Sequence, residues 1–227
     1  MPTVNEVKEK FLEFYFKRIS RQGSAELAEW LEKETDFFTA PASTKYHLSE
    51  PAGLCIHSLH VYSRLRKLYA AEKYRALGAA ELTPEEEEKI AVAGLLHDVC
   101  KTNFYTQEYR NRKTYDADKV RTADRFTVKH DAGGDFIWET VPVYTINDTM
   151  PYGHGEKSVM LVEKYMRLTD EERIAIRWHM GGFDCAVKGG ENSISQAYER
   201  YPFAVLLNIA DMQAAYLDEG DFPLFAK

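Results

Sequence analysis

The segment Ile-Ala-Val-Ala-Gly-Leu-Leu-His-Asp, residues 90–98, decides how this chain folds. It follows Thr83-Pro84 and four glutamates, which is the pattern of a helix start: a capping threonine, proline at the first position and acids facing the positive end of the dipole. The helix is apolar until it ends in two polar side chains, His97 and Asp98. A buried polar pair is costly unless it has a partner. Because imidazole and carboxylate together suit Mn, Fe, Co, Ni or Zn, a metal ion is the economical partner.

Further residues of the same chemistry extend this pair into an ordered series. His57 lies near the start of an expected long helix, His154 just before another helix, and His179 at the end of a third. Asp211 lies in the apolar stretch 206–211, where a bare carboxylate is expensive to bury. Six ligands exceed what one tetrahedral site needs, and they suit two metals bridged by one carboxylate and a water.

Composition excludes several classes of protein. The 227 residues are 44% hydrophobic, which is enough for a packed core, and the formal net charge of −7 argues against broad binding to long nucleic acids. No run of 18 apolar residues is present, and the first residues lack the apolar region of a signal peptide. Three widely spaced cysteines indicate reduced thiols. We therefore expect a cytoplasmic protein that contacts no membrane.

Helical periodicity dominates the chain. It predicts helices at residues 4–18, 24–33, 53–77, 84–98, 155–168, 170–180, 193–200 and 202–217. Ser24 is expected to cap the second of these helices. Residues 103–115 and 136–146 are rich in aromatic and β-branched residues and predict two strands of a ribbon, of which Pro142 makes the second an edge. The expected fold is therefore all-α, a helical bundle with a small two-stranded β-ribbon insertion. We expect one domain over 1–227, with an N-terminal helical pair at 1–35, a core at 45–217 and the ribbon arm at about 103–147.

The ligand-bearing fragments resemble the HD-domain metal-dependent phosphohydrolases over roughly residues 45–217. The fragments that carry the resemblance are Gly53-Leu-Cys-Ile-His57, Gly94-Leu-Leu-His97-Asp98-Val-Cys-Lys101, Gly153-His154-Gly, Trp178-His179-Met-Gly-Gly and Ile209-Ala-Asp211. The histidines at 154 and 179 look like the dinuclear branch of that superfamily. The resemblance implies that one metal is held by His57, His97, Asp98 and Asp211. It implies a second metal held by His154, His179 and the bridging Asp98.

The sequence leaves several assignments open. His57 and His60 stand three residues apart and share a helix face, so either can be the first ligand, and the alignment with the family motif favours His57. Gly181-Gly182 suits either close approach of a substrate or a helix C-cap. The two ions are expected to be divalent transition metals (Fe, Mn, Co, Ni or Zn), with Mg possible at one site.

The resemblance implies hydrolysis of a phosphate ester by a metal-bridging hydroxide. Asp98 is a candidate for general-base assistance and Lys101, one turn further on, for contact with a phosphate or leaving-group oxygen. Residues 101–130 carry eight Lys/Arg against four acids, interleaved with aromatic residues that can stack a base. We therefore expect a small phosphorylated substrate of the nucleotide or short-oligonucleotide class. The residues expected to bind it are Lys101, His47, Arg110 and Tyr105.

Two other functions compete with this one. The same ligand series resembles HD-type diiron oxygenases, although Lys101 and the cationic arm favour phosphate chemistry. A non-catalytic nucleotide sensor on the same fold is the second alternative, and the intact ligand series argues against it. The sequence does not distinguish monoester from diester hydrolysis, nor does it give the oligomeric state.

Overall fold

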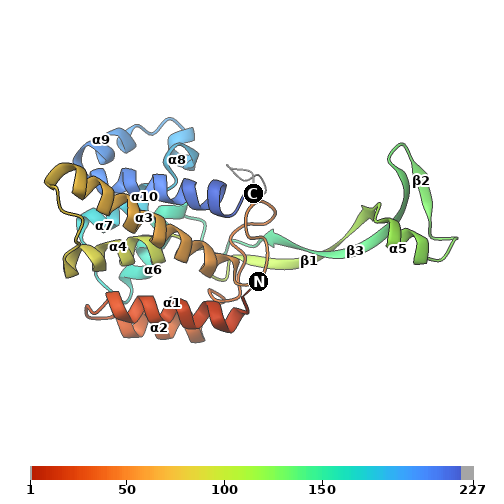
Figure 1. Ribbon diagram of the computed structural model, residues 1–227, viewed down its shortest axis with the longest axis horizontal. Coiled ribbons are helices and arrows are strands. Elements are labelled where there is room, and N and C mark those ends of the chain that lie inside the picture. Colours follow the sequence, from red (N-terminus) through yellow and green to blue (C-terminus); the bar gives the residue numbers. More distant parts are fainter. Residues whose placement is uncertain (1, 221–227) are drawn as a thin grey trace.

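A computed structural model describes residues 2–220 as a helical body from which a β-arm projects (Figure 1). The body contains α1 (Val4–Arg18), α2 (Ser24–Lys33), α3 (Gly53–Leu77), α4 (Pro84–Leu96), α6 (His154–Glu163), α7 (Asp170–Trp178), α8 (Cys185–Lys188), α9 (Ser193–Arg200) and α10 (Pro202–Gln213). The predicted all-α bundle with a small ribbon insertion is confirmed. In the described part of the chain, no helix has the length and apolar character needed to cross a membrane.

Threonine caps explain where three of the helices begin. The side chains of Thr3, Thr83 and Thr169 each accept a hydrogen bond from the backbone N–H three residues on. The glutamate carboxylate at that position in turn accepts a hydrogen bond from the backbone N–H of the threonine. Such capping boxes satisfy backbone donors that otherwise have no partner at a helix start.

The prediction that Ser24 caps α2 is wrong. Gly23 takes that position with a φ of +86°, and a Cβ there would lie 1.8 Å from the carbonyl oxygen of Tyr165. Only glycine adopts this conformation and tolerates this approach, so a backbone contact decides the cap.

Two glycines let ligand-bearing helices approach each other. A Cβ on Gly94 would lie 2.6 Å from the Cα of Tyr62, so α4 packs directly on the backbone of α3. A Cβ on Gly155 would lie 2.0 Å from the carbonyl oxygen of Arg177, so α6 packs in the same way on α7. These contacts bring the helices of His57 and His97, and those of His154 and His179, to the same part of the body.

The arm consists of β1 (Tyr105–Thr114), α5 (Ala117–Thr122), β2 (Lys129–Asp131) and β3 (Gly134–Ile146). β1 and β3 pair antiparallel along their length, from Tyr105 opposite Ile146 to Thr114 opposite Ile137, as predicted for the two strands. The arm departs from the expected two-stranded ribbon in having a third strand, because β2 pairs with the start of β3. Pro142 lies beyond that pairing, opposite Tyr109, where the other side of β3 carries no strand.

The last helix differs from the uniform α-helix predicted for 202–217. α10 ends at Gln213, and a π-helical turn, η3 (Ala214–Asp218), follows it. The backbone N–H of Glu219 closes this turn by donating to the carbonyl of Ala214, five residues back.

Candidate metal centre

Five of the six predicted metal ligands meet at the centre of the body. His57 comes from the first turns of α3, His97 and Asp98 from the end of α4, His179 from the end of α7 and Asp211 from α10. The side chains of His57, His97, Asp98 and His179 are almost entirely buried, and that of Asp211 is 17% exposed. Each of the four helices is long enough to be held by the core, so the side chains converge from rigid supports.

The distances between these side chains lie within, or 0.1–0.2 Å above, those between ligands of one ion. His57 Nε2 lies 3.1 Å from Asp211 Oδ1 and 3.7 Å from Asp98 Oδ2, and His97 Nε2 lies 3.6 Å from Asp98 Oδ2. Two atoms that each lie about 2.0–2.2 Å from a metal are roughly 3–3.5 Å apart at tetrahedral or octahedral angles. The donor atoms of His57, His97 and Asp98 all lie within 4.8 Å of one another, so one ion can reach all three.

The two oxygens of Asp98 face different imidazoles. Oδ2 faces His57 and His97, whereas Oδ1 lies 3.4 Å from His179 Nε2. A carboxylate in this position is suited to contact two ions at once.

Backbone carbonyls fix the tautomers of two histidines. Nδ1 of His97 lies 3.0 Å from the carbonyl oxygen of Gly94, and Nδ1 of His179 lies 2.7 Å from that of Ile176. Because a carbonyl only accepts, each Nδ1 must donate, which leaves the lone pair on Nε2. Both Nε2 atoms are buried and have no hydrogen-bond partner in the described structure. Unpartnered buried nitrogens aimed at carboxylates are what a metal site requires, so the residues present fit divalent ions.

The local charges also favour a cation here. Burial lowers the pKa of His57, but hydrogen bonds to Asp211 and Glu219 outweigh it and raise the pKa to about 10. Burial raises the pKa of Asp211, but His57 and the other imidazoles bring it down to about 2. Burial also lowers the pKa of His97, here to about 4, so that imidazole stays neutral and able to act as a ligand.

Lys101 lies against the cluster. It is 9% exposed, and its Nζ lies 2.6 Å from Asp98 Oδ2. Burial lowers the pKa of this ammonium, but Asp98 outweighs burial and raises it above its ordinary range. For the Asp98 carboxyl, Lys101 and the imidazoles outweigh burial and hold the pKa well below its ordinary range. Asp98 therefore stays ionised, and a permanent positive charge sits beside it.

Residues 54–212 match the family model described as the HD domain, which covers more than two thirds of the chain. The chain belongs to the HD-domain family. The HD domain is a superfamily of metal-dependent phosphohydrolases whose members bind divalent metals. No curated protein and no solved structure gives a significant match to the chain.

The sixth predicted ligand, His154, is the first residue of α6 and is partly buried. Its ring packs edge-on against Phe104, with the centroids 5.9 Å apart. Burial lowers the pKa of His154, and the charges of Asp98 and Lys101 act on it in opposite directions. His154 therefore is a neutral imidazole close enough to Asp98 and Lys101 to feel their charges.

A carboxylate that the sequence reasoning missed lies on the other side of His57. Glu219 accepts hydrogen bonds from Nδ1 of His57 at 3.0 Å, of His60 at 2.8 Å and of His47 at 2.5 Å. Of the two candidates for the first ligand, His57 thus lies with the other predicted ligands, and His60 hydrogen-bonds to Glu219. The signal in the sequence was the acidic pair Asp218-Glu219 directly after the last helix, but nothing in the helical spacing linked it to histidines far upstream.

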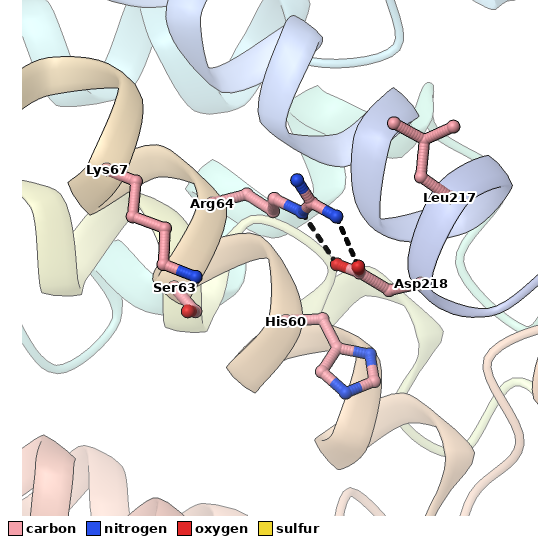
Figure 2. A pocket seen from close by; sticks show the side chains of 6 residues that line it. All are labelled: His60, Ser63, Arg64, Lys67, Leu217 and Asp218. Atoms are coloured by element: carbon pink, nitrogen blue, oxygen red, sulfur yellow. Dashed lines mark hydrogen bonds and ion pairs between the residues drawn. The ribbon is translucent and has the colours of Figure 1, made fainter. Parts of the chain in front are cut away.

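A cavity of about 510 Å³ opens beside His60 on the outer face of α3. Figure 2 shows Arg64 paired with Asp218 across it, while Lys67 and Ser63 project from the same helix face. Within residues 2–220, Lys67 makes no ion pair. The cavity therefore offers one unpaired cation about three turns along α3 from His57.

The other predicted substrate-binding residues are placed differently. The hydroxyl of Tyr105, at the base of the arm, donates to the carbonyl of Ala42 at 3.1 Å, and burial raises its pKa to about 12. Arg110 lies five residues further out on β1, where it is exposed and pairs with Glu108. Its contact with substrate stays a prediction. Lys113, Lys119 and Arg121 likewise pair with acids, so most of the cationic character predicted for the arm is neutralised within it.

Proposed function

We propose that this HD domain hydrolyses a phosphate ester of a nucleotide or a short oligonucleotide. The observation that carries the proposal is the buried cluster in which two partnerless imidazole nitrogens and the Lys101 ammonium converge on Asp98. Ions at such a site lower the pKa of water and neutralise phosphoryl oxygens when they are bound.

We propose two ions. His57, His97, Asp98 and Asp211 would hold the first, and His154, His179 and Asp98 the second. The support is the division of Asp98, whose Oδ2 faces one set of imidazoles and whose Oδ1 faces His179. The mixture of imidazole and carboxylate ligands suits Fe, Mn, Co, Ni or Zn, with Mg at one site as a further option.

In this proposal Asp98 and Lys101 supply fixed charges at the site, and the buried side chains around them exclude water. The lowered pKa of Asp98 suits a carboxylate that stays ionised better than a general base, which works best with a pKa near the ambient pH. Lys101 keeps its proton and can donate it in a charge-assisted hydrogen bond to a phosphate oxygen that reaches the cluster. Burial of the surrounding side chains keeps bulk water away from these contacts.

The cavity on α3 supports a substrate with more than one anionic group. Lys67, Ser63 and Arg64 offer donors about 9–15 Å along the helix axis from His57, at a rise of about 1.5 Å per residue. A nucleotide or a short oligonucleotide can extend over that distance, whereas inorganic phosphate cannot.

The test is an activity screen of the full chain with added Mn²⁺ on a generic aryl phosphodiester, an aryl phosphomonoester and a nucleotide panel. We expect hydrolysis by the wild type and none by Asp98→Ala. Asp170→Asn is the matched control, since that exposed carboxylate pairs with Arg173 at the far end of α7 from His179, and it should keep activity.

Two results would contradict the proposal. Substrate-dependent O₂ uptake with tightly held iron would indicate an HD-type diiron oxygenase. Equal inactivity of wild type and Asp98→Ala over the whole panel would indicate a nucleotide-binding domain without catalysis.

A further inference from the structure

The Glu219 carboxylate is the most heavily hydrogen-bonded acid near the metal centre. Its side chain is fully buried, and it lies between three imidazoles: His47 from the loop before α3, and His57 and His60 from α3 itself. Burial raises the pKa of Glu219, but the three histidines outweigh it and hold this pKa far below its ordinary range. The described structure thus places an ionised carboxylate in a protein interior, which is costly unless its hydrogen bonds are all satisfied.

The spacing around Glu219 differs from the spacing around Asp98. The nitrogens of His47, His57 and His60 lie 2.5–3.1 Å from its oxygens, which are hydrogen-bond distances. The imidazole nitrogens around Asp98 lie at 3.4–3.7 Å, which is wider than the hydrogen bonds around Glu219 and suits two ligands of one ion. His57 belongs to both groups, through Nδ1 to Glu219 and through Nε2 to Asp98 and Asp211.

The π turn explains how Glu219 reaches His57. In an α-helix, the residue seven places after Asp211 shares its face, and the residue eight places after is rotated by about 80°. A π turn closes with an i to i+5 hydrogen bond and so takes up about one extra residue. The extra residue in η3 turns Glu219 back to the face of Asp211 and leaves Asp218 to one side, where it pairs with Arg64. The carboxylates of Glu219 and Asp211 therefore lie against the two ring nitrogens of His57, Glu219 at Nδ1 and Asp211 at Nε2.

We propose that Glu219 is a positioning residue for the metal site: it fixes His57 with Nδ1 as donor, so that the Nε2 lone pair faces the ion. His47 and His60 brace the carboxylate and are not ligands. The inference rests on the metal site of the proposed function but needs no substrate. Carboxylates that hold a metal-bound histidine in this way commonly change metal affinity by about 10–100-fold when they are removed.

A third ion held by His47, His57 and Glu219 is the competing explanation, since their donor atoms also lie within 4.8 Å of one another. That ion would require His57 to bind metals through both ring nitrogens. It would also need donor atoms further apart than the 2.5 Å that separates His47 Nδ1 from Glu219 Oε2. The hydrogen-bonded carboxylate fits these distances and the third ion does not.

The experiment measures Co²⁺ binding to the full chain by equilibrium dialysis with metal analysis, together with the visible absorption spectrum of the bound Co²⁺. We expect Glu219→Ala to lower the affinity for the Co²⁺ ion at the His57 site by about 10–100-fold and to change the absorption spectrum of that ion. Glu219→Gln should lose less, because its amide oxygen still accepts from His57, but still more than twofold, because the amide is uncharged and cannot accept from all three imidazoles. Asp218→Asn is the matched control one residue away, and it should bind within twofold of the wild type.

Each remaining outcome is decisive. If Glu219→Ala does not fold, the isosteric Glu219→Gln carries the test, and Co²⁺ binding and a spectrum unchanged from wild type would overturn the proposal. Binding within twofold by both variants, or three Co²⁺ ions per wild-type chain, would also overturn it. A chain that binds Co²⁺ in the predicted manner but hydrolyses nothing would uphold this inference and end the proposed activity.

Discussion

The helical body buries a group of charged side chains, whereas the β-arm exposes its charged side chains to solvent. In the body, Asp98, Lys101 and His97 are buried with their charges and lone pairs directed at one point. In the arm, pairs such as Lys119 with Glu139 lie at the surface, where they are worth about 0–1 kcal/mol. The body therefore has a site prepared for ions, and the arm has a solvated surface that extends away from it (Figure 1). Chemistry is expected in the first region, and at most selection of substrate in the second.

Metal removal should give the largest difference between the two regions. Ions that bind the folded state at about 100 times their Kd stabilise it by about 2.7 kcal/mol, which is roughly 5–10 °C in Tm for a chain of this size. We expect chelation to lower the Tm of the wild type by this amount and that of Asp98→Ala hardly at all. A chain in which a short turn replaces residues 107–144 should respond to chelation as the wild type does. Loss of the response in that chain would place metal binding in the arm and remove the contrast.

A glycine-to-alanine substitution in each region compares how tightly the body and the arm are packed internally. Gly94→Ala places a methyl group 2.6 Å from the Cα of Tyr62. Overpacking of this kind costs about 1–3 kcal/mol, offset by up to about 1 kcal/mol of helix propensity. Gly133→Ala in the arm meets the end of the Tyr115 ring, which can move aside, so a change below about 0.5 kcal/mol is expected. Urea unfolding of both variants measures the difference, and equal costs would show that the helix approach at Gly94 is not tight.

The contrast also shows what the sequence could and could not predict. Helix starts such as Thr83-Pro84 were predictable because capping is local. The grouping of His57, His97, Asp98, His179 and Asp211 was predictable because these residue types are expensive to bury without a partner. The pair Gly23–Tyr165 was not, because the cap depends on a backbone contact between segments far apart in sequence. Glu219 was missed for a related reason: the π turn changes the helical period, and a 3.6-residue period puts Asp218 on the face that Glu219 occupies. The third strand β2 is only Lys129–Asp131, too short for a periodic pattern.

The smallest expected effects come from substrate contacts, and they show where the body gives way to the arm. Lys67→Glu should raise KM about three- to tenfold for mononucleotides and oligonucleotides alike and leave kcat unchanged, because it removes the unpaired cation of the α3 cavity. Arg110→Ser should leave mononucleotides unaffected and raise KM about two- to threefold for oligonucleotides, because Arg110 is five residues out along β1 and already paired with Glu108. Lys8→Glu, on α1 in a surface pair with Glu32, is the charge control because it lines neither the α3 cavity nor the arm. An effect of Arg110→Ser on mononucleotides would mean that the arm folds back over the metal centre, and an effect of Lys67→Glu on kcat alone would take the cavity out of the substrate path.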